Sequence, residues 1–306
     1  MKRIIQNSVL ILTLTLMIYY IANNYQTFKN NILSINPVYF PIILILFLLG
    51  TIAGGLIIKY LLQPFKIKLK LKEWFGLTLV TSFYNTITPF RGGLMAKAAY
   101  LKKKYDFSYT HFVSAMSGIY IVNFLVASLL GLLALYIIYV NKHIFNLLIF
   151  IAFLIILIPS LLIILLSPKV KNNKNKLLNS FVNVINGWHI IKKDKKIIFI
   201  SALVMIAQLL ISAATTLLVY YTIGVKLNFF ESLFITSIGL IVSFFSITPG
   251  GLGVTEAVAV FSAFIIGITP DQSLTVAIIQ RALSTIFIFI LGPIFVYQLI
   301  KKKSST

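Results

Sequence analysis

The sequence predicts an all-α polytopic membrane protein, built as an inverted-topology repeat with two broken, re-entrant helical hairpins. The first observation is composition: 59% of the residues are hydrophobic, 11% are charged, and the mean hydropathy is +0.98. The second is a motif that occurs twice. Ile87–Pro89 and Ile247–Pro249 both read Ile-Thr-Pro, 160 residues apart, and glycines follow each copy. Paired Gly/Pro breaks in the two halves of a membrane protein indicate a transport or binding site.

Long apolar stretches recur along the chain, and about 20 apolar residues suffice to cross about 30 Å of hydrocarbon. Two stretches, 74–101 and 229–267, each contain one Pro/Gly break. We expect the first unbroken helix to be retained, because no convincing small-residue cleavage site of a signal peptide follows it. The unbroken membrane-crossing helices are expected over 8–22, 38–60, 108–139, 144–166, 197–221 and 272–299.

The distribution of basic residues predicts the orientation. The net charge is +21, and alternating the loops from a cytoplasmic N-terminus places 21 basic residues inside, 3 outside and 3 in the membrane. This is a strong positive-inside pattern, so the charge indicates topology rather than nucleic acid binding. Attraction to anionic lipid head groups adds to it. We expect a cell-membrane protein with both termini cytoplasmic and a cytoplasmic loop over 168–196.

The two broken segments are predicted to enter from opposite sides. Lysines flank 74–101 at both ends, and the ten residues after its break cover about 15 Å as a helix, half a bilayer. This segment should therefore enter from the cytoplasm, turn near the midplane and return. The segment 229–267 lies between loops assigned outside. Its longer returning arm leaves either a re-entrant hairpin or two full crossings possible.

The offset of 160 residues extends beyond the motif. The helix at 38–60 maps onto 198–220, and 110–139 maps onto 270–299. We therefore expect a single membrane domain over 1–306, with repeat one over about 38–139 and repeat two over about 198–299. Helix 144–166 lies outside the repeat and would be the connector that inverts the second copy.

Each break also has a local interpretation. Thr88 and Thr248 are good N-cap residues, and Pro89 and Pro249 suit the first helical position. A helix N-terminus near the midplane is a ready anion site, and glycine lets a ligand approach closely. The candidate glycines are Gly92, Gly93, Gly250, Gly251 and Gly253. The alternative is that each motif builds a tight turn and binds nothing.

Charged residues within the apolar segments sharpen this hypothesis. The chain has 24 Lys and 3 Arg, yet Arg91 and Arg281 both lie in apolar sequence. Arg offers phosphate or carboxylate a planar, permanently charged fork. Glu256 is taken as the only acid inside an apolar segment, at a depth similar to that of Arg281. An ion pair between them is the structural hypothesis, and proton or cation uptake by Glu256 is the functional one.

Further polar residues lie near the same breaks. Lys97 either snorkels to the inner surface or joins Arg91 in holding an anionic head group. The pair Gly54-Gly55 is expected to allow close helix packing. Residues that could satisfy backbone groups or line a polar cavity are Asn85, Thr86, Ser246, Thr255 and Gln280.

No cofactor or metal site is expected. The chain has no Cys, and its three His show no metal-ligand spacing. No nucleotide-binding loop is present, and acid/base groups are scarce. We therefore expect a protein that is not an enzyme.

The residues around the breaks resemble a known family. They are Thr88-Pro89 with Arg91-Gly92-Gly93, Pro249–Gly253 with Glu256, Gln280-Arg281, and Gly292-Pro293. In this pattern the chain is similar to the lysylphosphatidylglycerol synthase transmembrane-region family of flippase-like proteins. Two-domain members move an aminoacylated phospholipid between leaflets and carry a soluble aminoacyltransferase domain. That domain is not expected here, because the chain stops soon after the last helix.

Repeat, arginines and resemblance together predict a lipid translocase or transporter for an amphiphile with an anionic phosphate head. Its partner would be a phospholipid or a polyprenyl-phosphate-linked lipid, with a separate transferase as a possible second partner. The alternatives are a membrane-embedded lipid-phosphate transferase, a lipid-presenting scaffold for a transferase, and an ion or small-solute transporter.

Overall fold

The computed structural model describes residues 19–166, 194–245 and 248–301, together with the single positions 15, 171, 182 and 192. Most of the predicted helix 8–22, most of the loop 168–196 and Ser246 therefore lie outside the described residues. The described part contains five helices long and apolar enough to cross a membrane. They match the expected segments and confirm an all-α, multi-pass membrane protein. Their bounds are Pro37–Phe65, Tyr109–Lys142, Leu147–Leu166, Lys195–Thr222 and Pro270–Leu299.

The described residues of the first half form a short peripheral helix, three long helices and two short helices, together with two 3-10 turns. The residue before α6, Ser108, caps it by accepting a hydrogen bond from the His111 N–H at 3.2 Å. The elements are α2 (Tyr25–Leu33), η1 (Pro37–Tyr39), α3 (Phe40–Leu61), η2 (Gln63–Phe65), α4 (Leu71–Ile87), α5 (Gly92–Tyr105), α6 (Tyr109–Lys142) and α7 (Leu147–Leu166).

The second half repeats the order of a long helix, two short helices and a long helix. Here Asp194 caps the first long helix by accepting from the Ile197 N–H at 3.1 Å. The elements are α9 (Lys195–Thr222), α10 (Phe229–Ser243), η3 (Pro249–Gly251), α11 (Val254–Ile265), α12 (Pro270–Val296) and η4 (Tyr297–Lys301).

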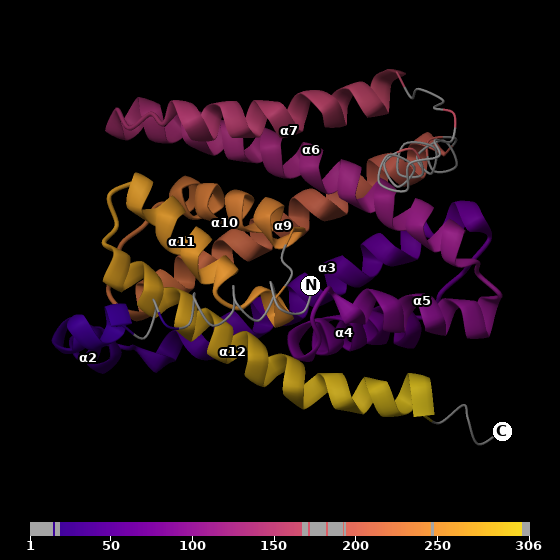
Figure 1. Ribbon diagram of the computed structural model, residues 1–306, viewed down its shortest axis with the longest axis horizontal. Coiled ribbons are helices and arrows are strands. Elements are labelled where there is room, and N and C mark those ends of the chain that lie inside the picture. The colour runs from indigo at the N-terminus through magenta and orange to yellow at the C-terminus, as the bar shows by residue number, and fades with distance from the viewer. Residues whose placement is uncertain are drawn as a thin grey trace.

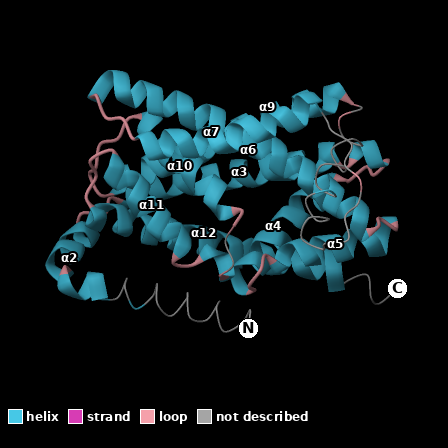
Figure 2. Cartoon of the chain, turned by 45° about the horizontal axis from the view of Figure 1, so that its top comes forward, coloured by secondary structure: helices cyan, strands magenta, loops and turns pink. Residues whose placement is uncertain are grey.

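The short helices on either side of each break are too short to cross a bilayer individually. Helix α5 has 14 residues and α11 has 12, which correspond to about 21 Å and about 18 Å at 1.5 Å per residue. The α4–α5 pair occupies the right half of the molecule and the α10–α11 pair the left half (Figures 1 and 2). The two breaks therefore point toward each other from opposite ends.

Long helices of the two halves pack against one another in an antiparallel sense. The N–H of Asn36, just before α3, donates to the carbonyl of Thr222 at the end of α9 at 2.7 Å. Helix α4 of the first half packs on α12 of the second half, and α10 of the second half packs on α6 of the first. In each half, the short helix before the break therefore packs on the long helix that follows the break in the other half. The start of α4 meets the end of α12, where a Cβ on Gly76 would come within 2.5 Å of Phe295. The predicted close packing at Gly55 is confirmed, because a Cβ there would lie 2.4 Å from Trp74.

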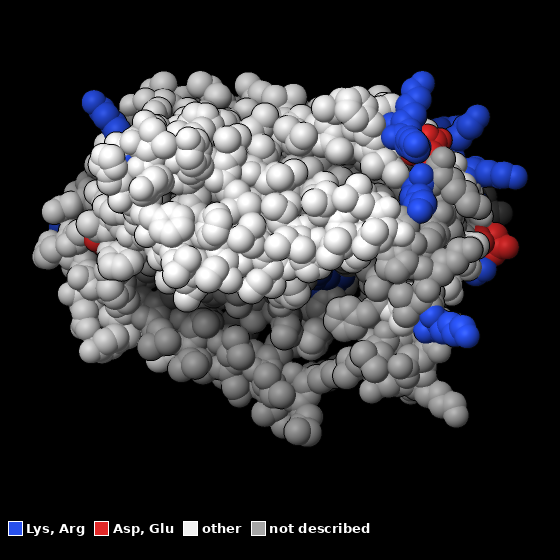
Figure 3. Space-filling view, turned by 90° about the horizontal axis from the view of Figure 1, so that it is seen from above, with Lys and Arg blue, Asp and Glu red and all other residues white. Residues whose placement is uncertain are grey.

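Basic side chains gather at one end of the molecule. Figure 3 shows most of the visible Lys and Arg at the right, where α5 ends in Figure 1. The loop between α3 and α4 and the end of α5 both carry lysines. The face in view is mostly uncharged between the two ends, and many large apolar side chains of the long helices are exposed, as contact with lipid tails requires.

Candidate functional site

The first break differs from its prediction. Helix α4 ends at Ile87, and the Thr88 hydroxyl donates back to the Tyr84 carbonyl instead of capping the next helix. Phe90 and Arg91 then adopt left-handed conformations, with φ of 53° and 55°, and α5 begins only at Gly92. The N-cap role of Thr88 was therefore predicted wrongly, because a Thr hydroxyl can also donate to the preceding turn.

Two consecutive left-handed residues other than glycine are a strained arrangement. Each costs on the order of 1 kcal/mol or more, and such strain clusters at functional sites. The glycines that follow close the hairpin. A Cβ on Gly93 would lie 2.0 Å from the Thr81 carbonyl oxygen, and the Gly93 N–H donates to Asn85 Oδ1 at 2.9 Å. Gly92 and Gly93 therefore allow close packing of the start of α5 on the end of α4, and neither is among the residues that line the two cavities described below.

The second break uses glycine throughout. Thr248 precedes the short helix η3, and Pro249 occupies its first position as predicted. The Thr248 hydroxyl, however, donates to the Leu252 carbonyl at 2.9 Å and caps no N–H group. Helix α11 starts at Val254, after positive φ angles of 57°, 69° and 83° at Gly250, Gly251 and Gly253. Only glycine adopts such angles without strain, which explains the Gly-rich sequence.

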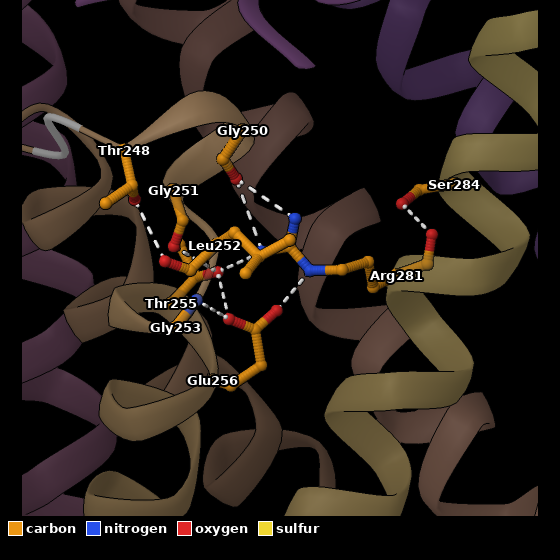
Figure 4. A network of polar contacts seen from close by, with 9 residues as sticks. All are labelled: Thr248, Gly250, Gly251, Leu252, Gly253, Thr255, Glu256, Arg281 and Ser284. Atoms are coloured by element: carbon orange, nitrogen blue, oxygen red, sulfur yellow. Dashed lines mark hydrogen bonds and ion pairs between the residues drawn. The ribbon is translucent and has the colours of Figure 1, made fainter. Parts of the chain in front are cut away.

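An ion pair joins the second break to the last long helix, as predicted. The Glu256 carboxylate on α11 pairs with the Arg281 guanidinium on α12 (Figure 4). Its other oxygen accepts from the Gly253 N–H at 2.7 Å, so the carboxylate also caps α11. The guanidinium further donates to the Gly250 carbonyl at 3.2 and 3.3 Å and to the Thr255 hydroxyl at 2.6 Å.

This network corrects one part of the anion-site hypothesis. The N-terminus of α11 already faces a carboxylate of the chain, so its dipole stabilises Glu256. Arg281 is likewise neutralised. The second break is therefore an internally paired unit whose net charge is close to zero, unlike the first break.

Arg91 reaches across from the first break to the end of α10. Its guanidinium donates to the Ser243 carbonyl at 3.0 Å and approaches the Tyr120 hydroxyl at 3.4 Å. It also lies over the Phe244 ring, 4.9 Å from the centroid, a cation–π contact. All of these partners are uncharged.

Lys97 does not reach the inner surface, which corrects the snorkelling alternative. Its side chain is buried, with 5% of the residue exposed, and both this burial and the nearby like charge of Arg91 disfavour a positive charge on it. No carboxylate serves either cation, although all six acids of the sequence lie in the described part of the chain. Their partners are Lys104 for Glu73, Lys102 for Asp106, Ile197 N–H for Asp194, Lys142 for Glu231, Arg281 for Glu256, and Asn31 for Asp271.

Two cavities meet where the breaks converge. The smaller cavity, about 240 Å³, lies between the breaks and is lined by Arg91, Asn85, Thr248 and Gly251 among others. The larger cavity, about 470 Å³, lies between α9, α10, α11 and α12 and reaches Glu256, Gln280 and Arg281. Five residues line both cavities: Thr86, Ser243, Gly250, Thr255 and Ile288.

The predicted site residues therefore divide into two groups. Arg91, Thr248, Gly250, Gly251, Glu256 and Arg281 line the cavities, together with the polar candidates Asn85, Thr86, Thr255 and Gln280. The second group supports the site from behind the cavity walls. Its members are Thr88, Gly92, Gly93, Lys97 and Gly253.

Two further carboxylates are buried, and their burial was not predicted from the sequence. Glu231 is 3% exposed and pairs with Lys142 at 2.6 Å. Glu256 is therefore not the only acid inside an apolar segment, and that prediction was wrong. Glu73 pairs with Lys104 and accepts from the hydroxyls of Tyr100 and Tyr105, each at 2.7 Å. Each acid lies in the first turn of a broken segment and caps it. A signal was available in the Asn228-x-x-Glu231 capping box.

Comparison with known proteins gives one match. The family model described as the lysylphosphatidylglycerol synthase TM region matches residues 5–292. No curated protein matches the chain. The match includes both breaks, the residues that line the two cavities and most of the last long helix, so the chain belongs to the lysylphosphatidylglycerol synthase transmembrane-region family.

Proposed function

We propose that this protein translocates an amphiphile with an anionic phosphate head group across the bilayer. The observation that carries the proposal is a charge imbalance between the two breaks, which we propose lie near the middle of the membrane. Arg91 belongs to the first break, and its described contacts are all with uncharged groups. Uncompensated charge at this depth is costly, and charged residues in membrane segments mark substrate pathways. A bound phosphate would supply the missing negative charge.

The contacts of Arg91 suit a transient ligand. A neutral carbonyl and a hydroxyl hold its guanidinium without satisfying its charge. Charge-assisted bonds to phosphate are stronger than these neutral ones, and a guanidinium presents two parallel donors to it. Arg91 faces the smaller cavity, and Asn85, Thr86 and Ser243 add polar groups around the same space.

The arrangement of the halves suggests how access alternates. In our proposal the halves are inverted repeats, each contributing one re-entrant hairpin, and the basic end of the molecule is cytoplasmic. Both hairpins meet the same cavities through Thr86 and Gly250. Opposed movement of the hairpins would open the phosphate site to each leaflet in turn, while the lipid tails stay in the bilayer.

A carrier fits the chemistry of the cavities better than an enzyme. Glu256 is the carboxylate that lines the larger cavity, and Arg281 and the Gly253 N–H already engage both of its oxygens. A general acid or base needs a group free to exchange a proton with substrate. In the proposed account any chemical modification of the lipid belongs to a separate transferase.

Reconstituted vesicles test the proposal. Purified protein is placed in vesicles with a trace of fluorescent phosphate-bearing lipid, and a membrane-impermeant quencher reports the fraction in the outer leaflet. We expect a transbilayer rate at least tenfold above that of protein-free vesicles, an effect of about 1.4 kcal/mol on the barrier. Mass spectrometry of the lipids should find the probe unchanged.

The comparison lipid is an uncharged diacylglycerol analogue with the same label and tails. It separates recognition of the head group from nonspecific disturbance of the bilayer. Equal rates with and without protein across phospholipid and polyprenyl-phosphate probes would refute translocation. A new lipid product would favour the enzyme alternative instead.

A further inference from the structure

The larger and smaller cavities differ in the kind of polar group that they present. The smaller one holds the guanidinium of Arg91. The larger one contains Glu256 and Arg281, which neutralise each other. The rest of its polar lining is neutral: hydroxyl groups from all four surrounding helices, and the amide of Gln280. The smaller cavity therefore offers a ligand an unneutralised positive charge, and the larger cavity offers mainly neutral hydrogen-bonding groups.

Part of this neutral lining has no partner inside the protein. The side chains of Gln280 and Thr285, both on α12, make no hydrogen bond to another described residue, and both residues line the larger cavity. By contrast, Ser212 donates to Gln208 at 2.9 Å and Thr236 donates to Ser232 at 2.7 Å. Donors and acceptors left unpaired away from bulk water are costly unless a ligand or water satisfies them.

Cationic head groups have no counter-charge in this cavity. The Glu256 carboxylate is engaged by Arg281 on one oxygen and by the Gly253 N–H on the other. An ammonium group placed beside it would have to compete with a guanidinium already in contact. It would also meet the positive charge of Arg91 in the adjoining smaller cavity. Like charges in a low-dielectric site repel strongly.

We infer that the transported lipid carries a neutral, hydroxyl-rich group on its phosphate, either a small polyol or a sugar. The phosphate lies in the smaller cavity against Arg91, and the hydroxyl groups of the head lie in the larger cavity against Gln280 and Thr285. The shared wall at Thr86 and Gly250 marks the passage between the two parts. This inference rests on the proposed translocation and adds the chemical class of the head group.

The size of the larger cavity agrees with this division. Its volume of about 470 Å³ falls within the range of about 300–1,000 Å³ that small-molecule sites occupy. A site built to hydrogen-bond hydroxyl groups discriminates strongly against an analogue lacking them, because its own polar groups are then left unpaired. Lipids with amine-bearing or aminoacylated heads are therefore excluded as substrates.

The test compares probe lipids with one label in the vesicle assay. The polyol arm is phosphatidylglycerol and the sugar arm is a glycosylated polyprenyl phosphate. Phosphatidic acid carries phosphate alone, and phosphatidylethanolamine and lysylphosphatidylglycerol carry ammonium groups. We expect at least one hydroxyl-rich arm to move about tenfold faster than either amine probe.

Variants of the larger cavity make the test specific. Gln280→Leu with Thr285→Val removes hydrogen bonding at nearly constant volume and breaks no bond within the protein. We expect it to slow the favoured hydroxyl-rich probe about tenfold and to leave phosphatidic acid within about twofold. The control is Ser160→Ala on α7, outside both cavities, where the hydroxyl bonds only the Ile156 carbonyl of its own helix. Wild-type thermal stability in detergent shows that each variant is folded.

Three results would overturn the inference. An amine probe that moves as fast as the hydroxyl-rich probes contradicts the charge argument. A Gln280/Thr285 variant that slows all anionic probes equally, or none, contradicts the recognition of hydroxyl groups. If phosphatidic acid and every other probe move no faster than in protein-free vesicles, the proposed function itself fails and this inference falls with it.

Discussion

The ion pair between Glu256 and Arg281 gives the sharpest prediction about stability. Glu256→Gln removes the negative charge, while a Gln oxygen still accepts the Gly253 N–H that caps α11. The substitution therefore isolates the charge from the cap. Arg281 is left as an unpaired cation beside the Gly250 carbonyl and the Thr255 hydroxyl.

The expected cost follows from burial. Removing one partner of a buried ion pair costs about 3–5 kcal/mol. The side chain of Arg281 is 26% exposed toward the cavity, and that of Glu256 is 5% exposed. The lower value applies because the cavity partly solvates the remaining charge, so we expect about 3 kcal/mol for Glu256→Gln and likewise for Arg281→Gln. The double variant carries no stranded charge and should cost about 3 kcal/mol rather than 6, a coupling of about 3 kcal/mol.

Unfolding in mixed micelles measures this coupling. The mole fraction of a denaturing detergent is raised, tryptophan fluorescence follows the transition, and the four proteins complete a double-mutant cycle. The exposed pair between Lys102 and Asp106, with side chains 44% and 90% exposed, is the matched control. Its cycle of Lys102→Gln and Asp106→Asn should give below about 0.5 kcal/mol, as for surface pairs on one helix.

An additive result at Glu256 and Arg281 would refute this reasoning. A coupling no larger than that of the Lys102–Asp106 control would mean that the pair does not join α11 to α12. The internally neutral second break would then lose its basis, and with it the charge difference between the two breaks.

Two further predictions concern the packing of the broken segments and use the same unfolding assay. Gly93→Ala should destabilise the protein by about 3 kcal/mol, because the new Cβ would press on the backbone carbonyl of Thr81. Gly239→Ala is the control, since no atom lies within 4 Å of a Cβ there, and it should change stability by less than about 1 kcal/mol. Equal effects of the two substitutions would contradict the tight contact of α5 with α4. Lys142→Met should lower the free energy of unfolding by about 2–3 kcal/mol, because it leaves the buried Glu231 carboxylate unpaired. Adding Glu231→Gln should restore at least half of that stability. If it restores none, the pair does not anchor α10.

Much of the fold was predictable because the bilayer constrains it strongly. Apolar length alone gave the spans α3, α6, α7, α9 and α12. The repeated Ile-Thr-Pro motif, with glycines after each copy, predicted the two breaks, since Pro and Gly interrupt a helix regardless of tertiary context. The similar depths expected for Glu256 and Arg281 in the membrane sufficed to predict that they pair, because a buried charge in a membrane requires a partner.

The predictions that were wrong concern the direction in which a side chain points, which its position along the chain does not determine. A Thr before a helix can accept from the next turn or donate to the previous one, and Thr88 donates to Tyr84. Whether Lys97 faces lipid or protein depends on how α5 packs, which spacing alone does not fix. Glu73 and Glu231 were overlooked because acids near the end of an apolar segment look like loop residues.

The two cavities also lay beyond sequence reasoning. Ser243 and Gln280 are 37 residues apart in sequence and come from α10 and α12, yet they line the same space. No periodicity predicts which hydroxyl groups of several helices converge. Only the packing of the second half around its break brings them together.

The central claim is that an unneutralised cation at the meeting of the two breaks carries anionic lipid across the membrane. Its most direct test is the initial transbilayer rate of a phosphate-bearing lipid in vesicles containing Arg91→Gln, compared with wild type. The control is Lys29→Gln, which also removes one positive charge but lies on the exposed helix α2, outside both cavities. We predict a rate at least tenfold lower for Arg91→Gln, since a charge-assisted hydrogen bond contributes about 1.5–3 kcal/mol, and an unchanged rate for Lys29→Gln. Equal rates for wild type and Arg91→Gln, with both proteins folded and equally reconstituted, would contradict the account.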